Sequence, residues 1–191
     1  MSQGVSKLRL EKSDLDCVPD IPVPEGYVLR TFREGDEAGL SRVFVASQLG
    51  NETPEKVHAL LMEHPCYKPG RVFVIEHAGE VVGTCSAWIN LREPDYGYLH
   101  MLGVSPEHRG KNLGRILSIA VAGYSLAEGF TRQRLDTDDW REPALRMYLS
   151  LNYVPLIADD THPTRWAAIG EKIGCLDVIG RARDVRAATA P

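Results

Sequence analysis

The stretch VSPEHRGKNLG, residues 104–114, decides the fold that this chain of 191 residues is expected to adopt. An apolar run typical of a strand ends at Val104, a turn with a proline follows, and an apolar helical repeat begins after Asn112. The first amides of a helix have no partner inside the helix, and they point outward along a positive dipole. Because this geometry binds phosphate groups, the stretch is a candidate phosphate or pyrophosphate site.

The side chains around this turn also favour an anion. Gly110 and Gly114 let a ligand and the sheet approach the backbone closely, and three cationic residues, Arg109, Lys111 and Arg115, add positive charge. The alternative is an ordinary surface turn whose charges are solvated. The residues of the turn alone do not separate these two interpretations.

Composition limits the classes of protein to be considered. Apolar residues make up 43% of the chain and charged residues 25%, as in ordinary globular domains. The net charge of −4 argues against nucleic acid as the main partner, which usually requires a basic face. No apolar run approaches the roughly 20 residues that span a bilayer. Residues 1–16 contain no apolar signal core, so we expect a cytoplasmic protein with no membrane partner.

The cysteines give no reason to expect a metal site. They are scattered and form no C-x-x-C pair, so neither a zinc site nor a thioredoxin-like motif is indicated. We expect them to be buried or idle thiols, and they stand at Cys17, Cys66, Cys85 and Cys175.

Hydrophobic periodicity predicts strands and helices after an extended arm at residues 1–25, which contains three prolines. The expected strands lie at residues 26–32, 71–77, 81–90, 96–104, 134–137 and 153–157. The expected helices begin near residues 36, 53, 112, 143 and 166. This order predicts an α/β fold with a mixed sheet flanked by helices. We expect a single domain at residues 26–175, followed by a C-terminal tail at residues 176–191.

Two motifs, in this order along the chain, resemble those of the GNAT superfamily of N-acyltransferases. RGKNLG at residues 109–114 is similar to R/Q-x-x-G-x-G/A, which cradles the pyrophosphate of coenzyme A in that family. ALRMYLSLNY at residues 144–153 is similar to the family pattern A-x-x-x-Y-x-x-x-G-F. The resemblance extends over residues 26–157. It implies a GNAT-like mixed central sheet in which a splayed, bulged strand opens the acyl-CoA site.

The sequence departs from the family pattern in three places. Asn112 stands where the family usually has glycine, and asparagine tolerates a left-handed backbone better than most residues. Arg141 stands where the second motif often has asparagine, and Asn152-Tyr153 replaces Gly-Phe. The family's final hairpin is also hard to find, because a helix is expected after residue 157.

The resemblance implies an N-acetyltransferase that moves an acetyl group from acetyl-CoA to a primary amine by direct attack. Acetyl-CoA would be the acyl donor, with no metal, and the acceptor would be a small-molecule or peptide amine. The protein would be a monomer or a homodimer. The cofactor-binding residues that the resemblance implies are Leu102, Gly103, Val104, Arg109, Gly110, Lys111, Asn112, Leu113 and Gly114.

Two residues are candidates for proton transfer. Tyr148 occupies the family's tyrosine position, where its phenol would donate a proton to the departing thiolate. The alternative is that Tyr148 packs with Ala144 and Leu151. His100 titrates in a useful range and would deprotonate the acceptor ammonium through a water molecule. The alternative for His100 is a structural role in its strand.

Other groups near the expected site leave alternatives open. Asp136, Asp138 and Asp139 would bind a cationic amine or form a solvated turn. Trp88 would line an acceptor pocket or pack in the core. The P-loop and Rossmann signatures are absent from the sequence, which argues against those nucleotide-binding classes. A non-catalytic acyl-CoA sensor on the same fold and a purely structural partner remain as alternatives.

Overall fold

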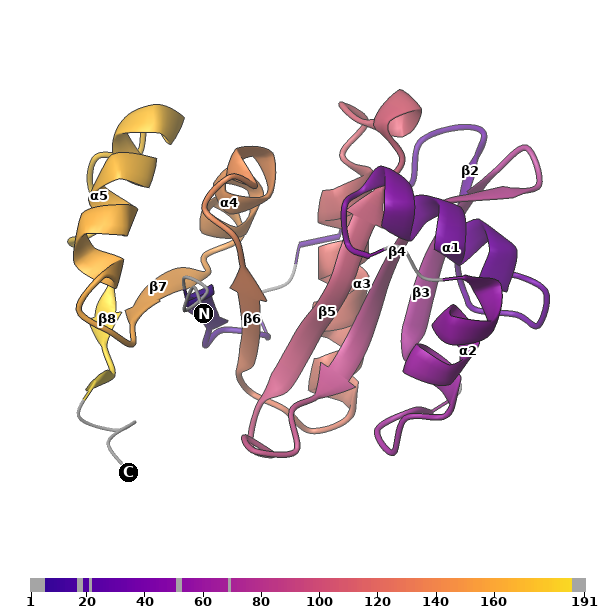
Figure 1. Cartoon of the computed structure of the whole chain (residues 1–191), viewed down its shortest axis with the longest axis horizontal. Coiled ribbons are helices and arrows are strands. Elements are labelled where there is room, and N and C mark those ends of the chain that lie inside the picture. The colour runs from indigo at the N-terminus through magenta and orange to yellow at the C-terminus, as the bar shows by residue number, and fades with distance from the viewer. Residues whose placement is uncertain (1–5, 17–18, 21, 51–52, 69, 187–191) are drawn as a thin grey trace, which may run out of the picture. The chain divides into compact units, whose positions relative to one another are not determined.

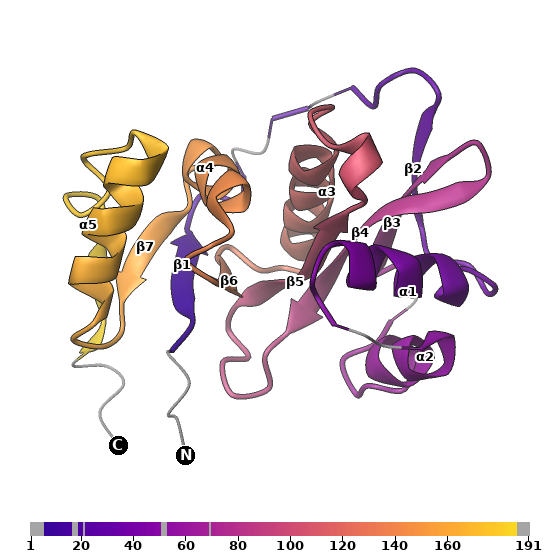
Figure 2. The same cartoon turned by 45° about the horizontal axis from the view of Figure 1, so that its top comes forward.

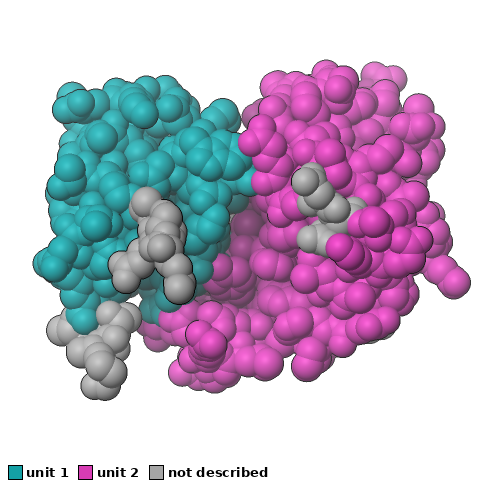
Figure 3. Space-filling view, viewed as in Figure 1, with its two compact units in different colours: residues 1–14, 134–191 teal, residues 15–133 magenta. Residues whose placement is uncertain are grey.

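The computed structural model describes residues 6–16, 19–20, 22–50, 53–68 and 70–186. The chain divides into two compact units, which Figure 3 shows in different colours. The larger unit spans residues 15–133, and the smaller unit combines residues 1–14 with residues 134–191. Each unit has its own strands and helices. No helix among the described residues has both the length and the apolarity needed to cross a membrane.

The larger unit contains an antiparallel sheet in the order β2-β3-β4-β5. Its strands are β2 (Tyr27–Thr31), β3 (Val72–His77), β4 (Glu80–Ile89) and β5 (Gly97–Val104). The strands predicted at residues 71–77 and 81–90 are confirmed as β3 and β4, which form a hairpin whose two connecting residues, Ala78 and Gly79, have φ values of 50° and 83°. Positive φ at both positions is typical of a type I′ turn, whose backbone twist matches the twist of the two strands that it connects.

Helices cover both faces of this sheet (Figures 1 and 2). Helices α1 (Glu37–Ala46) and α2 (Pro54–Met62) lie on one face, and α3 (Leu113–Ala127) lies on the other. The alternation of β3 explains this arrangement, because successive side chains of a strand point to opposite faces. Val72 and Val74 belong to the core beneath α1 and α2, whereas the ring of Phe73 meets Tyr124 of α3 with centroids 5.9 Å apart.

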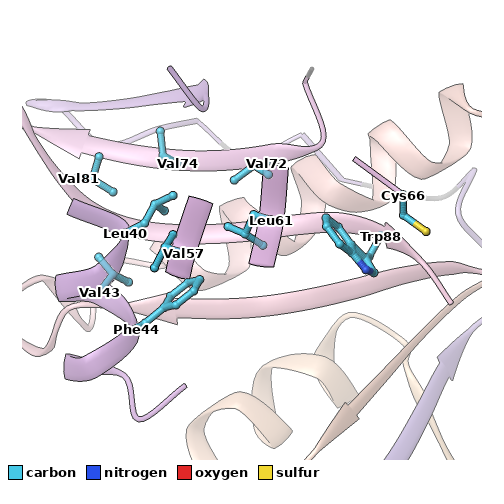
Figure 4. Packing of buried hydrophobic residues seen from close by; sticks show 10 residues of the cluster. All are labelled: Leu40, Val43, Phe44, Val57, Leu61, Cys66, Val72, Val74, Val81 and Trp88. Carbon is cyan, nitrogen blue, oxygen red and sulfur yellow. The ribbon is translucent and has the colours of Figure 1, made fainter. Parts of the chain in front are cut away.

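The core between the sheet and the helices α1 and α2 is almost entirely apolar. Figure 4 shows its ten buried residues, with Trp88 and Cys66 close together at one end. The start of α2 is as predicted: the Thr53 side chain accepts a hydrogen bond from the amide of Lys56, and Pro54 is the first helical residue. Two of the four cysteines, Cys66 and Cys85, are buried free thiols, as expected, and Cys17 lies outside the described residues.

The smaller unit contains strands in the order β6-β1-β7-β8. They are β6 (Gln133–Thr137), β1 (Leu8–Lys12), β7 (Val154–Ile157) and β8 (Arg183–Asp184), and the helices of this unit are α4 (Glu142–Ser150) and α5 (His162–Ile173). Strand β1 runs antiparallel to β7, whereas β8 runs parallel to β7. The prediction of a mixed sheet flanked by helices is therefore confirmed, and a helix does follow β7.

The predicted extended arm at residues 1–25 was wrong for residues 8–12, which form β1. Leu8 and Leu10 of this strand are fully buried. Glu11 of β1 is also buried, because it has partners far along the chain: it is 2% exposed and accepts hydrogen bonds from Arg134 at 2.9 Å and from Arg183 at 2.8 Å. The charged residues of this segment predict a polar arm, and only the structure shows the partners that allow it to form a buried strand.

The predicted C-terminal tail at residues 176–191 was also wrong in part. Val178 is buried, and Arg183 and Asp184 form β8 beside β7. Residues 187–191 lie outside the described residues. The single acyltransferase domain expected at residues 26–175 stays a prediction, since the boundary between the two units falls inside that range.

Candidate functional site

The turn between β5 and α3 has a left-handed backbone at two positions. Strand β5 ends at Val104, and a short 3-10 helix follows at Pro106–His108. Gly110 then takes φ +78°, and Asn112 takes φ 59° and ψ 12° immediately before α3. Asparagine is among the few residues with a side chain that adopt this conformation readily. The departure from glycine at this position therefore leaves the turn intact.

The N-terminus of α3 is suited to an anion. The Asn112 side chain makes no capping hydrogen bond, and the first turn of the helix contains no acidic residue. The first hydrogen bond inside the helix runs from the amide of Ile116 to the oxygen of Asn112, at 3.0 Å. The amides before Ile116 point along the positive end of the helix dipole, where a negative group is stabilised.

The surface of the turn is open and cationic. A Cβ placed on Gly110 would meet no atom within 4 Å. Arg109 and Lys111 are both exposed, and the Arg109 Nε donates to the backbone oxygen of Val104 at 3.3 Å. This bond holds the guanidinium beside the end of β5. Positive side chains next to uncapped helix amides are the pattern found in phosphate-binding turns.

Strand β5 contains the bulge that the resemblance implies. Ser86 pairs with His100 and Thr84 pairs with Gly103, so Met101 and Leu102 together face the single residue between Ser86 and Thr84. Met101 takes φ +54°, an uncommon conformation for a residue with a side chain. A bulge bends its strand and leaves one residue without its ladder partner, so backbone groups next to Leu102–Val104 become available to a ligand.

Close contacts explain the glycine at position 103 of β5. A Cβ on Gly103 would lie 2.8 Å from Ser47 Oγ and 2.8 Å from Leu49 Cδ1. Ser47 Oγ also donates to the backbone oxygen of Val104 at 3.3 Å. The segment after α1 therefore packs directly on the end of β5, next to the bulge. The opening of the acyl-CoA site that the resemblance implies beside this strand stays a prediction.

His100 lies in an aromatic cluster on the face of β5 that α1 and α2 cover. Its ring stacks on Trp88 with centroids 5.5 Å apart, and the ring of His64 lies 4.8 Å from Trp88. Burial, followed by the proximity of His64, lowers the pKa of His100 to about 4. His100 is therefore neutral at neutral pH and has a ring nitrogen that can accept a proton.

The other members of this cluster were only partly predictable. Trp88 is 8% exposed and belongs to the core, so the core-packing alternative describes it better than an exposed acceptor pocket. Sequence reasoning missed His64, which lies in the connection between α2 and β3. No motif marks a histidine that reaches a cluster from a loop distant in the sequence.

Tyr148 belongs to α4 in the smaller unit. It is 5% exposed, and its ring packs edge-on against Tyr153 with centroids 5.6 Å apart. The turn at residues 104–114 belongs to the larger unit, so the role of Tyr148 as general acid stays a prediction. The same holds for the cofactor-binding roles of the residues from Leu102 to Gly114.

Three aspartates in and after β6 have partners within the smaller unit. Asp136 accepts from Arg9 Nε at 2.8 Å, Asp138 pairs with Lys7, and Asp139 accepts from Arg165 Nε at 3.0 Å. The hydrogen bonds from Arg165 lower the pKa of Asp139. These carboxylates join β1, the end of β6 and α5, which favours a structural role over the binding of a cationic acceptor.

Comparisons with known proteins agree with this geometry. The model of the Acetyltransferase (GNAT) family matches residues 30–153. Mycothiol acetyltransferase of Thermomonospora curvata is 30% identical over 148 residues, which cover 74% of this chain and 49% of that protein. The protein of the same name from Thermobispora bispora is 31% identical over 169 residues, which cover 83% of this chain and 57% of that protein.

A solved structure shares the fold. The GCN5-related N-acetyltransferase from Sphaerobacter thermophilus matches with a TM-score of 0.63 and 23% identity, over 78% of this chain and 49% of that chain. The chain thus spans about half the length of the curated relatives it matches.

Because His100 is neutral when buried, we expect the free energy of unfolding to depend on pH. Its pKa is about 4 in the folded protein and about 6.5 when unfolded, so the unfolded chain binds more protons between these values. Stability should therefore fall as pH drops through this window, by about 1.4 kcal/mol per pH unit for one such group. Replacing His100 by Gln should remove this contribution. Urea unfolding at pH 7 and pH 5 measures it.

The matched control for this experiment is Lys56→Gln, since Lys56 is exposed on α2. We expect His100→Gln to lose less stability than the wild type between pH 7 and pH 5, whereas Lys56→Gln should follow the wild type. Parallel losses in all three proteins would contradict the burial of a neutral His100.

Proposed function

Because the chain belongs to the GNAT acetyltransferase family, we propose that it transfers an acetyl group from acetyl-CoA to the primary amine of a small molecule or peptide. The observation that supports this most directly is the uncapped N-terminus of α3 beside exposed cationic side chains. A pyrophosphate is the part of coenzyme A that such a turn would hold. The matched family transfers acetyl groups, which fits that ligand.

The residues of the larger unit fit acetyl-CoA in two places. The turn at residues 109–114 would hold the pyrophosphate through backbone amides, with Arg109 and Lys111 adding charge. The backbone of Leu102, Gly103 and Val104, next to the bulge, would hydrogen-bond the pantetheine arm. When bound, acetyl-CoA supplies a thioester that is reactive towards a neutral amine. No metal is needed for this reaction.

Two proton transfers are assigned to residues of the chain. His100 would take a proton from the acceptor ammonium through water, as a weak base, since burial lowers its pKa to about 4. Tyr148 Oη would donate a hydrogen bond and then a proton to the leaving thiolate.

The first acceptor to test follows from the relatives. Both are named mycothiol acetyltransferases, so the deacetylated form of mycothiol is a reasonable starting compound. Because the chain matches only about half of their length, other amines belong in the same screen. The main alternative, a non-catalytic acyl-CoA sensor, would bind acetyl-CoA without turnover on any amine.

Acetyl-CoA should stabilise the protein. A ligand present at about 100 times its Kd adds roughly 2.7 kcal/mol to the free energy of unfolding. For a domain of this size, each kcal/mol raises Tm by roughly 2–4 °C. Thermal unfolding with and without acetyl-CoA measures the effect, and S-acetylpantetheine, which lacks the pyrophosphate, is the control. A Tm unchanged by millimolar acetyl-CoA would rule out the proposed donor.

The conformation of the turn should matter more than its charge. Gly110→Val places a β-branched residue at φ +78°, which distorts the turn, whereas Lys111→Ala removes one exposed charge. We expect a loss of acetyl-CoA affinity of about 100-fold for the first variant and about 3-fold for the second, equivalent to about 2.7 and 0.7 kcal/mol. Calorimetric titration gives both values.

Gly129→Val is the matched control, because Gly129 follows the other end of α3 with φ +93° and open space around it. It should lower stability about as much as Gly110→Val and leave the affinity unchanged. Equal losses of affinity in the two valine variants would mean that the turn acts only through general stability.

Tyr148→Phe should lower kcat and spare the affinity for acetyl-CoA. The substitution removes one hydroxyl and keeps the ring that packs against Tyr153. General acid catalysis contributes about 100- to 10,000-fold, and the lower end applies because a coenzyme A thiolate leaves readily. The control is Tyr153→Phe, which changes the neighbouring ring in the same way. An unchanged kcat, with chemistry rate-limiting, would return Tyr148 to a packing role.

A further inference from the structure

A cavity of about 370 Å³ lies within the smaller unit, where β1 ends and where β7 and β8 begin. Its volume falls within the range of roughly 300–1,000 Å³ that is typical of small-molecule sites. None of the residues around it has a role in the proposed acetyl transfer. Its polar and charged lining residues are Glu11, Ser13, Asp14, Asn152, Arg181 and Arg183.

The register of the strands places three lining residues on one face of the sheet. Glu11 of β1 pairs directly with Val154 of β7, and Arg183 of β8 pairs with Leu156, two residues farther along β7. Directly paired residues point to the same face, and so do residues two apart in one strand. Glu11, Val154 and Arg183 therefore point to the same side, and the segments next to these strands supply the other polar groups.

The buried carboxylate of Glu11 fixes one edge of the Arg183 guanidinium. Arg183 Nη2 donates to Glu11 Oε1 at 2.8 Å and to Ser13 Oγ at 3.0 Å, while Glu11 Oε2 accepts from Arg134 Nε at 2.9 Å. Both protons of Nη2 are thus used. Nε and Nη1 of Arg183 make no hydrogen bond to the described residues, and the side chain is 46% exposed. Its second edge is therefore available to a ligand.

Arg181 is held by a backbone oxygen instead of a carboxylate. Its Nη2 donates to the oxygen of Leu149 at 3.2 Å, in the last turn of α4. The negative end of a helix dipole lies there, so a cation at this position is favoured. Arg181 forms no ion pair with a carboxylate of the part of the chain that the structure describes. Its charge is therefore not neutralised by the protein residues beside it.

The cavity carries an excess of positive charge. The buried Lys12 Nζ pairs with Asp14 at 2.6 Å, and Glu11 already has its partner on β6. The lining carboxylates therefore leave the charges of Arg181 and Arg183 unbalanced. Two guanidiniums at one cavity favour a ligand with two negative charges, and their planar donors match the oxygens of a phosphate group.

We propose that this cavity binds the phosphate monoester of a small hydroxyl-bearing molecule. The phosphate group lies between Arg181 and Arg183 and accepts hydrogen bonds from both. The Asp14 carboxylate and the Asn152 amide, on the same cavity, accept hydrogen bonds from hydroxyl groups on the rest of the ligand. The site belongs to the smaller unit alone, so its existence does not depend on the proposed acetyl transfer.

The first experiment titrates the ¹⁵N-labelled protein with glycerol 3-phosphate at constant ionic strength and follows the backbone amide signals. We expect the changes to be concentrated at Asp14, Asn152 and Arg183, with a Kd at least 10-fold below that of inorganic phosphate. Glycerol, which lacks the phosphate, should not bind. Changes confined to the turn at residues 104–114, or no binding at all, would overturn the site. Equal affinities for glycerol 3-phosphate and inorganic phosphate would overturn the ester as its ligand.

The second experiment compares arginine variants by calorimetric titration with glycerol 3-phosphate. Arg181→Gln and Arg183→Gln should each weaken binding by about 10- to 100-fold, as expected for the loss of hydrogen bonds to a charged group. The matched control is Arg186→Gln, because Arg186 is a similarly exposed arginine of the same unit that pairs with Asp184 and does not line the cavity. It should bind as the wild type does.

The two arginine variants keep the proposal falsifiable if one of them is unstable. Arg183→Gln removes a partner of buried Glu11 and is expected to lower Tm, whereas Arg181→Gln breaks no ion pair and should stay folded. Wild-type affinity in folded Arg181→Gln would overturn the site and leave both arginines with a structural role. A protein that acetylates an amine but does not bind glycerol 3-phosphate would contradict this proposal alone.

Discussion

The left-handed turn between β5 and α3 is the constraint on which the candidate site depends. Gly110 and Asn112 must both take positive φ for the chain to leave the strand and enter the helix at once. Because Asn112 does not cap α3 with its side chain, the first amides of the helix have no side-chain partner at this position. A side-chain cap would satisfy one of these amides internally, so its absence is consistent with the proposed binding of a pyrophosphate at this turn.

Strand β5, which precedes the turn, is also irregular, and its irregularity leaves backbone groups unpaired. The bulge at Met101 and Leu102 interrupts the ladder between β4 and β5, and Gly103 lets the segment after α1 pack against the strand directly beyond it. A regular strand would pair every backbone group and would leave none for a thioester or a pantetheine arm. The bulge, the close contact at Gly103 and the turn lie within a few residues of one another.

Much of this could be predicted because it is local in sequence. Neighbouring residues determine three local features: the turn at residues 104–114, the hairpin at Ala78-Gly79 and the cap of α2 at Thr53. The backbone preferences of these residues determine the local conformation. The family motifs lie in the same short segments, so the resemblance and the physical argument relied on the same residues.

What could not be predicted depends on partners far along the chain. Strand β1 has the appearance of a polar arm, because the arginines that neutralise Glu11 lie at positions 134 and 183. His64 and Ser86 reach the surroundings of His100 only through the packing of a loop and the register of two strands. A one-residue change of that register would turn Ser86 to the other face, and the sequence pattern of β4, which is buried on both faces, does not fix it.

The measurement that most directly tests the central claim is a titration of the ¹⁵N-labelled protein with coenzyme A, followed through the backbone amide signals. The account predicts that the largest changes occur at Gly110, Lys111 and Leu113–Arg115, where uncapped amides would meet the pyrophosphate. Binding of coenzyme A with these amide signals unmoved, and with the changes concentrated elsewhere, would contradict it.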